Sequence, residues 1–267
     1  MRSVLLALVC LFATGCAYDT PVYVKVDTSE SAFVIQLEGK NDQGTIKSED
    51  FLKKNMVATK RIQVSYRWIS TGYMPLAGMY IPNERVIVVD RSPETREWRS
   101  GPGGTANHDQ GIWVESSDSV GFSTGLSITA RIASEDDAVQ FLYNYPPKQQ
   151  RVIGEDKMYK NKYTVDVADL ADVMDKEVRT KAQAIFAYES ARYTMDELRA
   201  RKREVLDAVK NGTTINDPGK EPVVIEGIIE FFAKRGITIT AVGMFGGFAY
   251  ENPAIQKSID AVFQAQQ

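Results

Sequence analysis

The fold is decided by the stretch Asp118-Ser119-Val120-Gly121-Phe122-Ser123-Thr124-Gly125-Leu126-Ser127-Ile128-Thr129-Ala130-Arg131-Ile132, where the character of the chain changes. Its central part, Gly121–Arg131, is predicted to form one long strand. Ser134 and Asp137 follow and are typical of a helix N-terminus, with aspartate where glutamate or glutamine is usual. Strand patterns precede this stretch and helical patterns follow it, which predicts a protein of the α+β class.

Several strand patterns lie before this stretch. Arg61–Ile69 alternates polar and apolar side chains, which is the period of a half-buried strand. Arg85–Asp90 is a β-branched run and predicts a strand that is buried on both faces. Shorter patterns predict strands near Val26 and over Ala32–Leu37, Thr95–Trp98 and Ile112–Glu115, and a short helix or loop over Ser48–Asn55.

Helical periodicity dominates the second half of the chain. An apolar stripe predicts one helix from about Val165 to Tyr193. Thr194 and Glu197 then form a capping box that begins a new helix. The outer face of the long helix offers three pairs in the favourable order, with the acid four residues before the base: Asp172 with Lys176, Asp175 with Arg179, and Glu177 with Lys181.

The last part of the chain carries loop, helix and strand signals in turn. Residues 211–219 are polar and turn-forming, so they predict a surface loop. Pro222 suits the first turn of a helix that ends at a glycine C-cap, Gly236. Ile237–Val242 predicts a strand, and Asn252-Pro253 predicts the start of a last helix.

The N-terminus has the pattern of a bacterial lipoprotein signal. Met1-Arg2-Ser3 carries one positive charge, an apolar run from Val4 to Phe12 follows, and Ala13-Thr14-Gly15 places small residues before Cys16. The apolar run is about half as long as a bilayer-spanning helix. We therefore predict cleavage before Cys16 and lipidation of this residue, with an ordinary cleaved signal as the alternative.

The composition is that of a globular protein whose mature part has no disulfide. Hydrophobic residues make up 43% of the sequence and charged residues 25%, which suffices for a core. The formal net charge of −3 gives no indication of a nucleic-acid partner. Of the two cysteines, Cys10 lies in the signal and Cys16 is the predicted lipid site. The predicted organisation is a signal peptide over 1–15, a tether over 16–24, a β-rich subdomain over 25–145 and a helical subdomain over 146–267.

In their order, these patterns resemble those of the SPFH or band 7 family, which includes stomatin, prohibitin, flotillin and HflK/HflC. The resemblance spans roughly residues 25–267. It rests on the opening stretch with Ala138 after it, and on the later segments Arg203-Glu204-Val205, Gly236-Ile237-Thr238-Ile239, Asn252-Pro253-Ala254-Ile255-Gln256-Lys257-Ser258-Ile259 and Ala265-Gln266-Gln267. It implies a β-rich SPFH subdomain before a helical one, in a membrane scaffold without catalytic activity. Such a scaffold self-associates and organises or regulates a membrane partner, for bacterial relatives most often a protease.

The sequence departs from the family pattern in two places. Relatives have an N-terminal transmembrane segment or re-entrant hairpin, whose place a lipid on Cys16 would take. Relatives also continue from the final Ala-x-Gln motif into a long coiled coil, whereas this sequence stops at Gln267. We therefore expect a homo-oligomer in the form of small rings or lateral clusters, not a cage walled by coiled coils.

Residues that could carry chemistry are few. The single histidine, His108, lies in the glycine-rich segment 100–111 and is interpreted as a solvated loop residue, with a metal ligand or general base as the alternative. The second glycine-rich segment, 243–247, is expected to allow a bend or close packing. The basic cluster Arg199, Arg201, Lys202 and Arg203 is interpreted as a solvated helix face, with binding of phosphate or lipid headgroups as the alternative. We predict no catalytic, cofactor-binding or metal-binding residue.

Cys16 also predicts where the protein acts. A lipid on this residue places the protein outside the cytoplasm, attached to a membrane. Ala17 follows the cysteine where aspartate would favour inner-membrane retention, so we expect the periplasmic leaflet of the outer membrane in a Gram-negative host. Two other functions stay open: a monomeric lipoprotein that binds a ligand or a surface, and an enzyme whose Ser or Asp residues the patterns do not reveal.

Overall fold

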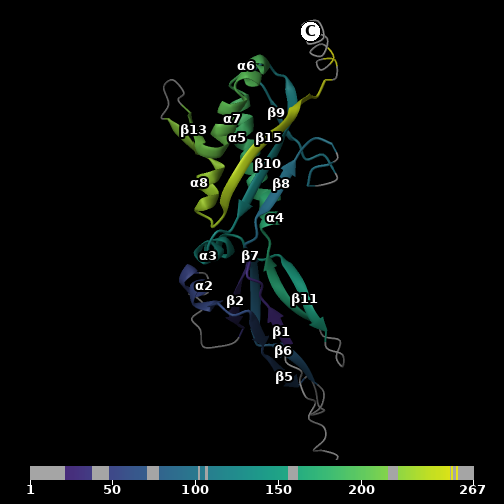
Figure 1. Ribbon diagram of the computed structural model, residues 1–267, viewed down its shortest axis with the longest axis vertical. Helices are drawn as coiled ribbons and strands as arrows, with labels where there is room; N and C mark the ends of the chain where they lie inside the picture. Colours follow the sequence, from purple (N-terminus) through teal and green to yellow (C-terminus); the bar gives the residue numbers. More distant parts are fainter. Residues whose placement is uncertain are drawn as a thin grey trace, which may run out of the picture.

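The protein is elongated and has two lobes along its long axis (Figure 1). The computed structural model describes residues 22–37, 48–70, 78–101, 103–105, 108–155, 162–215, 222–252, 254 and 257. The lower lobe is built on a five-stranded sheet and the upper lobe on a four-stranded sheet, with helix α3 (Glu135–Asn144) between them. This mixture of helices and mainly antiparallel sheets confirms the predicted α+β class.

The sheet of the lower lobe has a core on each face. Its strand order is β11 (Gln149–Glu155), β12 (Lys162–Ala168), β7 (Glu84–Asp90), β2 (Glu30–Gln36) and β3 (Met56–Val57), and only the β7–β12 pair is parallel. One face packs on a second sheet of β1 (Val22–Lys25) and β4 (Arg61–Val64) through buried valines such as Val24 and Val86. The other face, with Phe33 and Ile87, joins a core that continues past α3 into the upper lobe.

The predicted single strand over Arg61–Ile69 is two strands. β4 ends at Val64 and pairs with β1, whereas β5 (Tyr66–Ser70) forms a hairpin with β6 (Gly78–Pro82). Between the two strands, the carbonyl oxygen of Ser65 accepts a hydrogen bond from Asn83 N at 3.0 Å. The alternating pattern continues across this break because both strands are half-buried, so the sequence does not show where the pairing partner changes.

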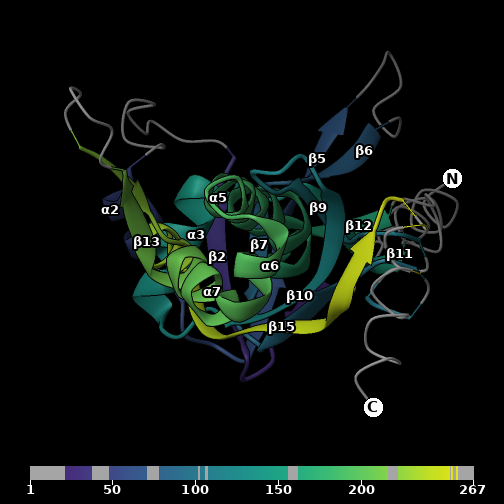
Figure 2. The same ribbon diagram turned by 90° about the horizontal axis from the view of Figure 1, so that it is seen from above.

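In the upper lobe, strand β10 (Gly121–Arg131) is central and has the predicted bounds. It pairs with β15 (Thr238–Tyr250) on one side, and with β8 (Glu94–Trp98) and β9 (Ile112–Glu115) on the other. Its apolar side chains, including Phe122 and Ile128, face helices α5 (Arg179–Ser190), α7 (Lys202–Asn211) and α8 (Ile228–Ala233). Figure 2 shows the sheet curving around these helices, all of which lie on one side of it.

The helix predicted from Val165 begins later, at Leu170. Residues 162–168 instead form β12, because Val165 and Val167 pack against the valine core of the lower lobe. Asp169 then acts as an N-cap whose side chain accepts a hydrogen bond from Ala171 N at 2.9 Å. Helix α4 (Leu170–Val173) follows, then a single π-helical segment η2 (Met174–Val178), and then α5. The apolar stripe in the sequence thus did not distinguish the end of a strand, an α-helix and a π-helical segment.

The loop predicted over 211–219 begins as a strand. β13 (Gly212–Ile215) and β14 (Val223–Glu226) form a hairpin, and the helix expected from Pro222 starts only at Ile228, after Gly227. Both capping boxes are confirmed: Ser134 and Asp137 begin α3, and Thr194 and Glu197 begin α6 (Met195–Ala200). The short helix expected before Asn55 is α2 (Glu49–Asn55). The last helix predicted from Asn252 falls largely outside the described residues.

Both large sheets take strands from either side of the predicted boundary at residues 145 and 146. β11 and β12 return to the lower lobe and pair with β7, while β15 pairs with β10. The chain therefore passes between the lobes more than once. Within the described part of the chain, no helix combines the length and the apolar character that crossing a bilayer requires.

Candidate functional site

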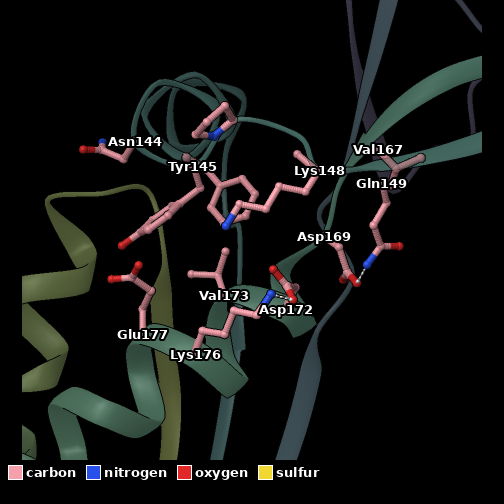
Figure 3. Close-up of a pocket in the computed structure, with 13 residues that line it drawn as sticks. Asn144, Tyr145, Lys148, Gln149, Val167, Asp169, Asp172, Val173, Lys176 and Glu177 are labelled. Atoms are coloured by element: carbon pink, nitrogen blue, oxygen red, sulfur yellow. Dashed lines mark hydrogen bonds and ion pairs between the residues drawn. The ribbon is translucent and has the colours of Figure 1, made fainter.

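The first candidate site is a pocket at the junction of the two lobes, which we call the junction pocket (Figure 3). It encloses about 220 Å³ between the C-terminal end of α3, the end of β12 and the start of the α4–η2–α5 helix. Its polar lining residues include Tyr145, Lys148, Asp169, Asp172, Lys176 and Glu177. Residues that are distant in sequence thus meet where the chain passes from one lobe to the other.

Local interactions hold both walls of this pocket in place. The α3 wall ends where Tyr145 N donates to the carbonyl oxygen of Phe141 at 2.8 Å. On the facing wall, Asp169 caps α4 and also accepts a hydrogen bond from Gln149 Nε2 at 3.0 Å. The same carboxylate therefore ties the end of β12, the first residue of β11 and the start of a helix together.

The π-helical segment provides two of the lining residues, Lys176 and Glu177. Its hydrogen bonding skips one residue, as shown by Arg179 N donating to Met174 O, five residues earlier. Short π-helical segments inside α-helices are frequent at functional sites, because the inserted residue changes the direction of the side chains around it. This feature supports a functional role for the junction pocket.

The same segment explains which of the predicted helical ion pairs form. Asp172 and Lys176 form one, with Oδ1 and Nζ 2.5 Å apart. Asp175 does not pair with Arg179; it accepts a hydrogen bond from the buried Trp98 Nε1 at 2.9 Å and pairs with Arg96 at 3.2 Å. Residues four apart lie on one face of an α-helix but not of a π-helix, so the register of the later pairs is lost.

The third predicted pair, Glu177 with Lys181, is replaced by other contacts. Lys181 Nζ lies over the ring of Phe231, 4.6 Å from its centroid. Glu177 instead turns towards Tyr145, on the same side of the junction pocket (Figure 3). Burial, and then the charge of Glu177, raise the pKa of Tyr145 to about 12. Its hydroxyl therefore stays protonated at neutral pH and can donate a hydrogen bond.

The charges of the junction pocket suit binding of a small polar molecule. Figure 3 shows the amino group of Lys148 pointing into the pocket. Within the part of the chain that the structure describes, Lys148 forms no ion pair, whereas Lys176 is paired with Asp172. Donors and acceptors of hydrogen bonds therefore line the same small space.

We predict that Tyr145 makes the protein sensitive to alkaline pH. A phenol with a pKa of about 12 in the folded chain and an ordinary value of 10.0 in the unfolded chain contributes stability that is lost as the pH rises from about 10 to about 12. Tyr145→Phe should therefore reduce the loss of unfolding free energy over this range, as measured by urea denaturation at several pH values. The exposed Tyr143 on the same helix provides the control, Tyr143→Phe, which should leave the profile unchanged. Equal profiles for wild type and Tyr145→Phe would contradict the prediction.

The second candidate site is an exposed apolar surface on the upper lobe, made by Val223 and Val224 of β14 and Ile229 of α8, which we call the hairpin surface. The exposed fractions of these side chains are 55%, 74% and 37%. Successive residues of a strand point to opposite faces, so both faces of β14 carry an exposed valine. A two-stranded hairpin is marginally stable by itself in water. Its exposed apolar side chains make this surface a candidate for contact with another molecule.

Another apolar side chain, that of Trp113 on β9, is 43% exposed on a different part of the upper lobe. β9 and the β13–β14 hairpin lie on opposite flanks of the upper lobe (Figures 1 and 2). The upper lobe thus carries exposed apolar side chains on two flanks.

The structure places the residues singled out in the sequence as follows. Cys16 lies outside the described residues. His108 is exposed, and across the described ranges no three His, Cys, Asp or Glu side chains gather as a metal site. In the second glycine-rich segment, Gly246 has a φ of +74° beside a break in the β10–β15 register, which confirms the expected bend.

The basic cluster around residue 201 lies against aromatic rings. Arg201 pairs with Glu204 at 3.1 Å, as expected for a solvated face. Its guanidinium also lies 5.2 Å from the Tyr193 ring centroid, and Lys202 Nζ lies 4.5 Å from that of Phe248. Glu197, one turn before Arg201, accepts hydrogen bonds from the backbone and the hydroxyl of Thr194. The cluster thus covers the end of β15, and part of its charge is used within the fold.

Sequence patterns missed the junction pocket because no pattern relates residues 144–149 to residues 167–177. The only local signal is the π-helical segment, which helical periodicity does not distinguish from an α-helix. The hairpin surface had a signal that was overlooked, since Val223, Val224 and Ile225 form a β-branched run. In comparison with known proteins, the chain matches no family model and no curated sequence.

Proposed function

We propose that this protein is a lipid-anchored membrane scaffold whose copies associate side by side through their upper lobes. The observation that carries the proposal is the hairpin surface, where apolar side chains are exposed on both faces of a two-stranded hairpin. A second copy is the occupant we propose, because Trp113 offers an apolar contact on the opposite flank. The resemblance of the sequence to SPFH scaffolds supports the same function.

The shape of the molecule supports an orientation in which the lower lobe stands next to the membrane. Val22, the first residue of β1, follows Cys16 by six residues, which reach at most about 20 Å when extended. β1 belongs to the lower lobe, so a lipid on Cys16 would keep that lobe close to the bilayer (Figure 1). The hairpin surface would then lie away from the membrane, and copies in one leaflet would present it at the same height.

Two different flanks favour a head-to-tail arrangement over a twofold dimer. When one surface of each copy binds another surface of the next, the contacts form a ring if the rotation closes and an open array if it does not. Anchoring in one leaflet restricts the copies to a plane, which raises their effective concentration. Small rings or lateral clusters are the assemblies that this geometry supports. The lipid signal adds a position on the extracytoplasmic side, and the resemblance adds a membrane protein, such as a protease, as the partner.

We predict that Val224→Asp weakens self-association about tenfold or more, because it places a charge where apolar contact is expected. The measurement is crosslinking or native mass of the full lipidated chain in membranes. Val152→Asp is the matched control, since Val152 is a valine 56% exposed on a strand of the lower lobe. Equal weakening by both variants would overturn the assignment of the surface, and a strictly monomeric wild type would overturn the scaffold.

The junction pocket favours a second function, that of a monomeric lipoprotein that binds a ligand. The supporting observation is the Lys148 amino group that points into a pocket lined by the π-helical segment. A small polar molecule bound there would contact both lobes and fix their relative position. Two measurements distinguish the two functions. Pull-down from native membranes detects the partners of a scaffold, and native mass spectrometry detects a small molecule that a ligand-binding lipoprotein retains.

A further inference from the structure

A second and larger cavity lies in the lower lobe, where β7 and β12 separate. These parallel strands are paired only over Ile87–Val89 with Asp166–Ala168. The residues that precede the paired segments, among them Glu84 and Arg85 on β7 and Tyr163 on β12, line a cavity of about 390 Å³. This volume is within the range of small-molecule sites. Neither the hairpin surface nor the junction pocket includes it.

A buried carboxylate organises the polar groups of this cavity. Asp166 is only 8% exposed, and its Oδ2 accepts a hydrogen bond from Arg85 Nε. Its Oδ1 accepts a second hydrogen bond, from Gln150 Nε2 at 3.0 Å. Arg85 is held through Nε alone, so its two terminal nitrogens have no partner among the described residues. The guanidinium is therefore oriented by Asp166, and the half-exposed side chain has donors left over.

Two tyrosines form the aromatic part of the lining. The rings of Tyr66 and Tyr163 meet edge to face, with centroids 4.7 Å apart. Burial, followed by the proximity of Tyr163, raises the pKa of Tyr66 to about 12. The Tyr66 hydroxyl has no hydrogen-bond partner in the described part of the chain, so it is a further free donor. Ring surface and free donors thus face the same space.

The charges of the cavity favour a neutral ligand over an anion. The positive charge of Arg85 is balanced by Asp166, to which it is hydrogen-bonded. Glu84, which is unpaired among the described residues, adds a further carboxylate to the lining. A phosphate or carboxylate group would meet two negative charges for one positive charge. A hydroxyl group, in contrast, can accept from Arg85 or Tyr66 and donate to Glu84.

We infer that this cavity binds a neutral polyhydroxylated ligand of the glycan class. Adjacent hydroxyls would engage the terminal nitrogens of Arg85 and the carboxylate of Glu84, and the apolar face of a sugar ring would lie on the tyrosines. Because the ligand itself carries no charge, a modest affinity that is insensitive to salt is expected.

The inference is tested by titrating the full chain with N,N′-diacetylchitobiose and with maltotriose. NMR or calorimetry measures the binding. Arg85→Met should weaken binding about tenfold or more, because it removes donors from a charged group. Tyr66→Phe keeps the ring and should weaken binding about threefold to tenfold. Arg131→Met, on an exposed arginine of β10 outside the cavity, should have no effect. Thermal unfolding of each variant checks that the fold is kept.

The same variants separate a glycan from an anion. Inorganic phosphate and vesicles containing anionic lipid are the competing probes, the first for a free anion and the second for a lipid headgroup. The inference would be overturned if one of these probes binds, Arg85→Met abolishes that binding, and the oligosaccharides do not bind. The ligand would then be a free anion or a lipid headgroup, according to the probe that binds. Absence of binding by all probes, or oligosaccharide binding that Arg85→Met and Tyr66→Phe leave unchanged, would overturn it outright.

Discussion

Gly236→Ala should lower the free energy of unfolding by about 3 kcal/mol. Gly236 has a φ of +77°, a conformation that costs other residues about 1–2 kcal/mol. An alanine Cβ would also lie 2.0 Å from the carbonyl oxygen of Asp137 and 2.7 Å from the amide nitrogen of Phe141. Both are backbone atoms of α3, which cannot move without disturbing the helix. Overpacking of this kind costs a further 1–3 kcal/mol or about that amount. This turn between α8 and β15 thus depends on glycine to pack on α3.

Gly243→Ala is the matched control because it lies on β15, seven residues away. No atom lies within 4 Å of a Cβ built there, so the expected change is within about 0.5 kcal/mol. Urea denaturation followed by tryptophan fluorescence measures both variants. A small change for Gly236→Ala, similar to that of the control, would show that α3 does not pack on this turn.

Cys16→Ser should release the protein from the membrane. If Cys16 carries the lipid, serine removes the attachment site for the acyl chains that hold the protein in one leaflet. The expected result is transfer of nearly all of the protein from the membrane fraction to the aqueous fraction. Membrane fractionation measures this transfer, and mass spectrometry of the N-terminal peptide detects the lipid.

Cys10→Ser is the control for this experiment, because Cys10 lies inside the predicted signal and is removed with it. The control should stay membrane-bound and lipidated. If the Cys16→Ser protein also stays on the membrane and clustered, another segment anchors the protein. The orientation proposed for the two lobes would then lose its basis, whereas the hairpin surface could still be tested with Val224→Asp.

Local signals predicted the elements whose formation depends on nearby residues. β10 has the predicted bounds, and both capping boxes begin helices where expected. A cap is formed by residues three apart in sequence, so its chemistry can be read without knowledge of the rest of the fold. The glycine expected at the end of α8 is of the same kind: the C-cap is Lys234, and Gly236 follows it with a φ of +77°, which glycine tolerates.

Elements that depend on distant partners were assigned wrongly. Val167 fits the predicted helical stripe, yet residues 162–168 form a strand because the lower lobe offers β7 as a parallel partner. Residues 212–215 are polar and turn-forming, yet they pair with β14. In both segments the hydrogen bonds available from another strand outweigh local preference, which is a weak determinant of strand formation.

Short-range patterns account for the α+β class, the helix caps and the central strand, because each depends on residue types at short spacing. The lipid site at Cys16 is a prediction of the same kind. The junction pocket and the Arg85–Asp166 cavity, in contrast, exist only through the packing of the folded chain. Both cavities bring together segments that are separate in sequence, and Arg85 and Asp166 are 81 residues apart. Such contacts form when separate strands and helices bury their apolar faces in one core, and no short-range pattern records which of them will meet.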